Sequence, residues 1–249
     1  MQHLLRKQII TGALLLCISF ASMAQRGDVY QPFYDEDLFY LGFNVGINNN
    51  YYNFNRNVEF ASPAAGAVSS INPKNNISLT MGLAGTLRLS THTLLRLNPT
   101  VVIAGSKNLF TFTRIEYPNG NPTMNAATAL INIPLALKIV SDRYNAFHYT
   151  DIMRHYVFVG GKIDYDLVGP NGSIQNSTSG SEPIYKNIFN SLDYGYEMGL
   201  GVSFYLPYAT ISPEVKFSYG VRNLNKGAPL LSSIRDITSN FVYFTIHVE

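Results

Sequence analysis

Hydrophobic and polar residues alternate with a period of two along most of the chain, as they do in β-strands whose two faces meet different surroundings. In residues 77–89, for example, Leu79 and Leu83 lie on one face while Thr80 lies on the other. The alternation predicts strands rather than amphipathic helices, whose period is about 3.6 residues. Eight segments show the pattern, and they comprise residues 38–48, 77–89, 94–104, 126–139, 154–167, 192–206, 209–222 and 241–248.

The length of these segments favours strands that cross a membrane. Most are 11 to 15 residues long, whereas strands of soluble domains usually have about 5–6 residues and membrane-spanning strands need about 9–11. All twelve charged residues within the segments lie on the less hydrophobic face, a pattern that a soluble β-sandwich would share. They are Arg88, Arg96, Lys138, Arg154, Lys162, Asp164, Asp166, Asp193, Glu197, Glu214, Lys216 and Arg222.

The gaps between segments distinguish a membrane barrel from a sandwich. Long and shorter gaps alternate, as in outer-membrane barrels with their long outer loops and short periplasmic turns. A closed sheet also satisfies every backbone N–H and C=O group in lipid. We therefore predict an all-β fold, an eight-stranded antiparallel up-and-down transmembrane β-barrel formed by residues 38–249. The long gaps comprise residues 49–76, 105–125, 168–191 and 223–239, and the shorter gaps comprise residues 90–93, 140–153 and 207–208.

The N-terminus has the features of a secretory signal peptide. A basic start precedes an apolar stretch over residues 9–20, and the small residues Ser22 and Ala24 precede a cleavage site. We predict a signal peptide in residues 1–24 and a periplasmic tail in residues 25–37. The leader and the barrel together predict Sec-dependent export to the outer membrane of a Gram-negative cell.

Composition narrows the functional classes. Charged residues make up only 14% of the chain, against about 25% in an average soluble domain. Aromatic residues make up 13%, and those near segment ends, such as Tyr156, Tyr205 and Tyr243, suit the interfacial girdles of a barrel. Cleavage removes Arg6 and Lys7, two of the 18 basic residues, which leaves as many basic as acidic residues and no basic field for nucleic acid. The single cysteine excludes a disulfide scaffold.

If the hydrophobic face meets lipid, the charged face lines the barrel interior. Side chains about fill an eight-stranded barrel, and charges enclosed there must pair or stay hydrated. We therefore expect the twelve charges, except that of Arg154, to form a salt-bridged interior network. A lumen filled in this way leaves no path for a polypeptide, although a narrow path for an ion or a solute is an alternative.

The distribution of histidines argues against an enzyme. His92, His148, His155 and His247 lie at the periplasmic turns or at the end of the last strand, so the long outer loops lack a general base. The spacing of His148, Asp151 and His155 is not specific for a metal. We predict a protein without catalytic residues, cofactor or metal.

Several short stretches resemble one known family. They are residues 34–43, before and within the first strand, residues 96–99, residues 133–135, residues 141–143 and residues 160–167. They are similar to the PorT/SprT family of outer-membrane barrels from Bacteroidetes, and the likeness extends over most of the mature chain. The sequence departs from outer-membrane barrels in general at its end, where Val248-Glu249 stands in place of the usual terminal aromatic residue.

The resemblance implies a role in type IX protein secretion, which supports gliding in some of these bacteria. Because the lumen is expected to be filled, we expect an accessory or assembly component, with outer-membrane lipid and other membrane or periplasmic proteins of the system as its partners. The gap at residues 140–153 has 14 residues, against 4 and 2 in the other periplasmic turns, and unusually long loops are often functional. The expected partner contacts are Asp35, Glu36, Asp37, Arg143, Tyr144, His148, Tyr149 and Asp151.

Two other readings remain. A small passive porin or a surface-adhesion barrel would have the same strands and the same leader. A secreted barrel of the lipocalin type would also have eight strands, but its interior would be hydrophobic and its exterior charged.

Overall fold

The computed structural model describes most of the region predicted to form the barrel. The predicted signal peptide and the predicted tail, apart from Asp37, lie outside the described residues. No helix among the described residues is long and hydrophobic enough to cross a membrane. The described residues are 37–58, 68–73, 75–114, 123–144, 152–167, 173–175, 185–186, 189–227 and 234–249.

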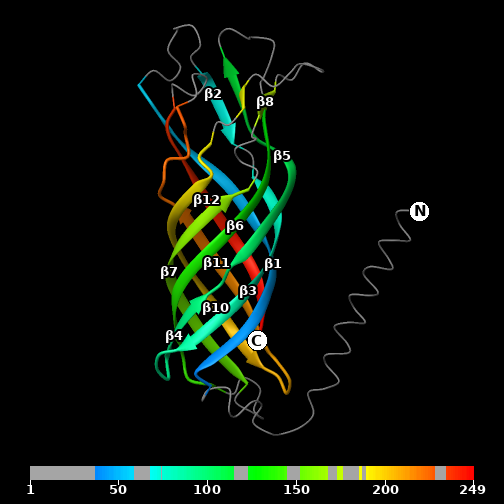
Figure 1. Ribbon diagram of the computed structural model, residues 1–249, viewed down its shortest axis with the longest axis vertical. Coiled ribbons are helices and arrows are strands. Elements are labelled where there is room, and N and C mark those ends of the chain that lie inside the picture. Colours follow the sequence, from blue (N-terminus) through cyan, green and yellow to red (C-terminus); the bar gives the residue numbers. More distant parts are fainter. Residues whose placement is uncertain are drawn as a thin grey trace, which may run out of the picture.

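Antiparallel strands form a closed ring with eight positions (Figure 1). The ring closes where the first strand pairs with the last, with Phe43 opposite Val248. The predicted eight-stranded up-and-down barrel is therefore confirmed. In ring order the strands are β1 (Phe39–Arg56), β3 (Asn76–Arg88), β4 (Thr93–Leu97) together with β5 (Thr100–Arg114), β6 (Thr123–Val140), β7 (Met153–Asp166), β10 (Leu192–Tyr205), β11 (Thr210–Gly220) and β12 (Ile234–Val248).

The third ring position is shared by two strands, whereas the sequence pattern predicted one strand over residues 94–104. The break falls at Asn98 and Pro99. Proline has no N–H group to donate to the ladder, so the strand is interrupted there. The neighbouring strands still bridge the gap, because Leu83 N donates to Pro99 O at 3.0 Å and Asn98 N donates to Pro134 O at 3.3 Å.

At the end of the barrel with the long loops, several strands continue beyond the predicted segments. β1 ends at Arg56 rather than at residue 48, β5 ends at Arg114, and β12 begins at Ile234 rather than at residue 241. Beyond the lipid the outward face need not be hydrophobic although backbone pairing continues, so the hydrophobic pattern is lost before the strand ends. The short strands β2 (Val68–Pro73), β8 (Ser173–Gln175) and β9 (Tyr185–Lys186) extend this part of the sheet.

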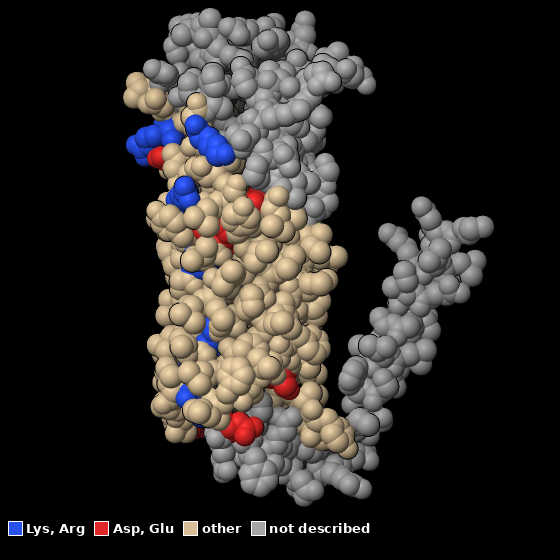
Figure 2. Space-filling view, in the orientation of Figure 1, with Lys and Arg blue, Asp and Glu red and all other residues tan. Residues whose placement is uncertain are grey.

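The hydrophobic face of the strands points outward. Leu83 is 66% exposed and Leu135 is 51% exposed, while charged residues on the other face are buried. The middle of the visible surface is accordingly almost free of charged side chains (Figure 2). This orientation suits lipid and excludes the soluble barrel with a hydrophobic interior.

Part of the interior is aromatic, which corrects one expectation. Tyr156, Tyr205 and Tyr243 are buried inside the barrel rather than placed in an interfacial girdle. Each has the same parity as its inward-facing neighbours, so its strand directs it into the lumen. Two hydrophobic clusters result, one of Leu94, Ala136, Val140, Tyr156 and Phe158, and one of Val102, Leu130, Phe241 and Tyr243.

Candidate functional site

The candidate site is the lumen of the barrel, whose two sides differ in charge. β1 and β3 contribute uncharged inward residues such as Asn44, Asn48 and Thr80. The strands from β4 to β11 contribute the buried charges. Eight of the eleven charges predicted for the network are buried, namely Arg96, Lys138, Lys162, Asp164, Asp193, Glu197, Glu214 and Lys216.

An ion pair between Arg96 and Glu214 crosses the lumen. Arg96 Nη2 lies 2.7 Å from Glu214 Oε2, and both side chains are fully enclosed. Arg96 belongs to β4 and Glu214 to β11, which occupy the third and seventh positions of the ring and so face each other across its diameter. The hydroxyl of Tyr156 also donates to Glu214 at 3.1 Å. The pair between Arg96 and Glu214 thus connects opposite walls of the barrel.

A second layer of pairs lies nearer the long loops. Lys216 Nζ lies 3.1 Å from Glu197 Oε2 and donates to Asn132 Oδ1 at 3.4 Å. The amide nitrogen of Asn132 in turn donates to Asp164 at 2.5 Å, and Lys162 Nζ lies 2.6 Å from the other oxygen of Asp164. Asn132 thus connects two ion pairs, each of which combines a lysine with a carboxylate.

Aromatic rings lie over two of the buried cations, Arg96 and Lys138. The Arg96 guanidinium lies 4.8 Å from the centre of the Phe158 ring, and Lys138 Nζ lies 3.8 Å from that of Tyr156. Cations over ring faces are attracted by the ring quadrupole. The rings therefore stabilise the charges of these buried side chains.

Glycines on the neighbouring strand β10 make room for these rings. A Cβ atom at Gly201 would lie 2.3 Å from the Tyr156 hydroxyl oxygen, and one at Gly199 would lie 2.5 Å from the Phe158 ring. Either contact is too short for two real atoms. The rings and the glycines thus fill the lumen at the level of Arg96.

The other three predicted network residues lie at the rims. Arg88 Nε donates to the carbonyl of Asp37 at 3.1 Å, at the end of β3. Arg222 is half-buried just beyond the last residue of β11, and Asp166 is half-buried at the end of β7. These side chains therefore do not join the central pairs, because the strands that carry them end at those levels.

His247 also lies in the lumen, where it was not predicted. The sequence placed it only at the end of the last strand, yet its side chain is fully buried and its Nε2 lies 3.6 Å from Glu214 Oε1. The signal was present, since His247 alternates with the outward-facing Ile246 and Val248. The contacts of Tyr156 with Glu214 and of Asn132 with Asp164 and Lys216 were not predicted, because alternation shows which face a residue occupies but not which residue it contacts.

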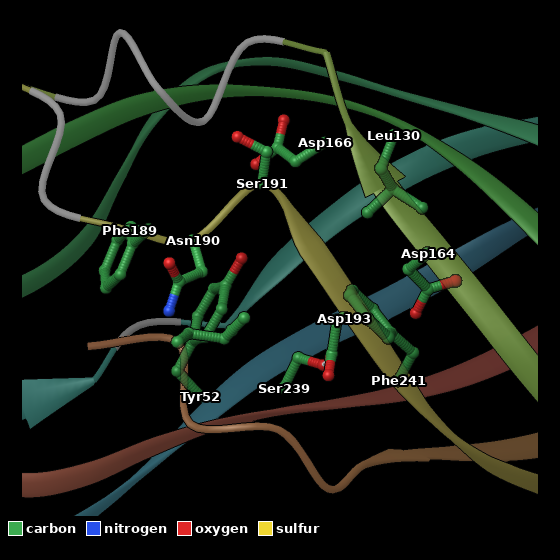
Figure 3. Close-up of a pocket in the computed structure, with 11 residues that line it drawn as sticks. Tyr52, Leu130, Asp164, Asp166, Phe189, Asn190, Ser191, Asp193, Ser239 and Phe241 are labelled. Carbon is green, nitrogen blue, oxygen red and sulfur yellow. Dashed lines mark hydrogen bonds between the residues drawn. The ribbon is translucent and has the colours of Figure 1, made fainter. Parts of the chain in front are cut away.

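A small pocket, open to solvent, lies at the end of the barrel with the long loops (Figure 3). Asp164, Asp166 and Asp193 line it. Asp193 accepts hydrogen bonds from the hydroxyl of Ser239 and, at 2.8 Å, from the backbone N–H of Tyr194. Among the described residues, no group of three or more His, Cys, Asp or Glu has an arrangement that could hold a metal ion.

The expected partner contacts at the other end are only partly described. Asp37 is exposed, while Arg143 lies with its guanidinium 3.7 Å from the centre of the Tyr205 ring. Tyr144 is hydrogen-bonded to His155 at 2.8 Å, with the two rings stacked. The residues that lie outside the described part of the chain are Asp35, Glu36, His148, Tyr149 and Asp151.

One family model of outer-membrane barrels matches most of the chain. Residues 24–226 match the model of the outer membrane protein beta-barrel domain family. Among solved structures, Neisserial surface protein A is 10% identical with a TM-score of 0.43, over 83% of this chain and 96% of that one. The outer membrane protein OprG from Pseudomonas aeruginosa is also 10% identical, with a TM-score of 0.46 over 84% and 93% of the two chains. No curated protein matches the chain.

Proposed function

The chain belongs to the outer membrane protein beta-barrel domain family and is an outer-membrane protein, and from this premise we propose that it serves type IX protein secretion. In this proposal it is an accessory or assembly component of the system and not the conduit for the secreted polypeptide. The role is non-enzymatic, without a cofactor, and extends to gliding where the system supports it. Its partners are outer-membrane lipid and other membrane or periplasmic proteins of the system.

The ion pair between Arg96 and Glu214 is the main observation that supports an accessory role over a conduit. It joins opposite walls of the barrel at 2.7 Å, in a layer that Phe158 and Tyr156 also fill. Side chains about fill an eight-stranded barrel in any case. A polypeptide could pass only if these buried pairs broke and the barrel opened.

The turn between β6 and β7 supports the contact with a partner. Arg154 Nε donates to the carbonyl of Ser141 at 2.5 Å, and Arg143 and Tyr144 rest on Tyr205 and His155. These contacts fix both ends of the longest turn at this end of the barrel. Anchored ends reduce the conformational entropy that the turn would lose on binding a partner.

Deletion of residues 146–150 in the native cell tests the proposal. The strands stay intact, so the protein should remain heat-modifiable on gels, while secretion of type IX cargo into the medium should fall. Deletion of five residues from an outer loop, residues 118–122, is the matched control and should leave secretion unchanged. Normal secretion after deletion of residues 146–150, with the variant present in the outer membrane, would reject the role.

A small passive porin is the second candidate, favoured by the uncharged side of the lumen. The side-chain polar atoms of Asn48, Asn50, Ser78 and Thr80 are buried there without hydrogen-bond partners among the described residues. Buried polar groups are usually satisfied by protein or by ordered water. A hydrated path along β1 and β3 would supply that water and pass small ions. A surface-adhesion barrel would instead use the strands that extend beyond the bilayer, such as β2 and β8.

A further inference from the structure

A buried lysine in the lumen lacks a hydrogen-bond acceptor. Lys138 is 2% exposed and lies two residues before the end of β6, at the end of the barrel opposite the long loops, where β4 also lies (Figure 1). Among the described residues its ammonium group forms neither a hydrogen bond nor an ion pair, and it only lies over the Tyr156 ring, 3.8 Å from the ring centre. A ring face attracts the positive charge but does not replace an acceptor for the N–H groups of lysine.

The guanidinium of Arg96 brings further unbonded donors to the same wall. Its Nη2 bonds Glu214, whereas its Nε and Nη1 are buried without a hydrogen-bond partner among the described residues. In the pairing of β4 with β6, Arg96 lies opposite Ala136, two residues from Lys138. The guanidinium carbon also lies 6.0 Å from the centre of the Tyr156 ring. Two buried cations with unbonded donors therefore lie beside one ring, which favours an anion.

The nearby carboxylates do not supply the acceptor that Lys138 lacks. Glu214 is paired with Arg96. The charge of Glu249 reaches Lys138 through space, but Glu249 interacts with other groups, and Arg154 opposes its effect on Lys138. Buried donors are usually satisfied by protein or by another bound group, and an enclosed charge without a partner is costly.

The surroundings of the ammonium group indicate the size of the anion. Both strand neighbours of Lys138 belong to a hydrophobic cluster, Leu94 on β4 and Phe158 on β7. Hydrophobic side chains offer no donors to the oxygens of a phosphate or sulfate ion. Removing water from a doubly charged oxyanion also costs more than removing it from a singly charged ion. A monatomic anion with one charge suits this place better.

We propose that a chloride-sized anion binds beside Nζ of Lys138, in the field of Arg96, and enters from the periplasm. Lys138 donates a hydrogen bond to the anion, and Arg96 adds positive charge while it keeps its bond to Glu214. The bound anion thereby compensates the buried lysine. The proposal does not depend on the role in secretion, because it concerns the lumen and not the turn between β6 and β7.

Chloride itself is the probe, and gluconate, which is too large for the filled lumen, replaces it at equal ionic strength. The mature full-length barrel is purified in dodecyl maltoside, and the urea midpoint for loss of the heat-modifiable form is measured in both salts. Chloride should raise the midpoint, because a ligand that binds only the folded state stabilises it. The chloride NMR signal should also broaden in the presence of the protein, and the broadening should saturate.

Substitutions at Lys138 locate the site. Lys138→Met keeps the length of the side chain and removes its charge, so the excess chloride line width should fall by about tenfold or more. The difference between the midpoints in chloride and gluconate should disappear. Lys138→Gln provides the same test if Lys138→Met fails to fold. Lys226→Met is the matched control, since Lys226 is exposed beyond the end of β11 at the other end of the barrel, and it should keep both effects.

Three outcomes would overturn the proposal. Equal midpoints in the two salts together with an unbroadened chloride signal would mean that water alone satisfies Lys138. Chloride effects that persist in Lys138→Met would place the anion elsewhere. An equal loss in Lys226→Met would indicate a general effect of charge. Secretion is measured separately and is not affected by any of these results.

Discussion

At the scale of single residues, the lumen depends on charges that are buried in pairs. Glu214 is the most connected of them, because Arg96, Tyr156 and His247 all approach its carboxylate. Removing one partner of a buried ion pair leaves the other charge without compensation, whereas replacing both partners by hydrophobic residues of similar size is often neutral.

Glu214→Gln should therefore destabilise the barrel, by roughly 3–5 kcal/mol, since Arg96 loses its counter-charge. The measurement is the urea midpoint for loss of the heat-modifiable folded form in detergent. The double variant Arg96→Met with Glu214→Leu is the control, and it should regain most of the lost stability. A double variant as unstable as Glu214→Gln would show that the pair itself, rather than the unpaired arginine, accounts for the effect.

Alternation along the sequence predicts which residues enter the lumen, but not which of them meet. Arg96 and Glu214 are 118 positions apart, and their contact depends on the register and tilt of strands on opposite sides of the ring. The same limit explains why Asn132 was missed as a bridge between lysines. His247 could have been placed by its parity alone, and the position of Arg222 just past the end of β11 could not.

At the scale of strands, the bilayer determines where the sequence is informative. β3 was predicted almost to the residue, because lipid on one side and a polar lumen on the other require strict alternation along it. β1 was predicted only to residue 48, although it continues to Arg56, where lipid no longer selects for hydrophobic residues. The break at Pro99 was missed because the alternation continues across it.

Leu83→Lys tests this lipid face. Leu83 is exposed in the middle part of β3, so a lysine there should cost roughly 2–4 kcal/mol and reduce insertion. Val58→Lys is the control, since Val58 is 98% exposed but lies beyond the end of β1, outside the bilayer. The measurement is the yield of heat-modifiable protein in outer membranes. Equal yields of the two variants would contradict the assignment of the face to lipid.

At the scale of the whole molecule, the closed ring and the buried side chains of the lumen determine where any path through the barrel must run. The ring has no free edge, so opening it would break a full strand ladder such as that of β1 with β12. The lumen must therefore conduct, if at all, around the layer formed by Arg96 and Glu214. At that layer the side chains, and not the backbone, limit the width of the lumen. Substitutions there can therefore widen the lumen without changing the strands.

Planar-bilayer recordings test this conclusion. The purified protein should give no steady conductance steps, because we expect the pair between Arg96 and Glu214, 2.7 Å apart across the lumen, to obstruct the path of ions. The double variant Arg96→Ala with Glu214→Ala removes both side chains, leaves no unpaired charge from the pair and should give small steps. Leu135→Ala, on the outward face, is the control and should remain silent. Steady steps from the unaltered protein would favour the porin, since they would require a hydrated path past the intact pair.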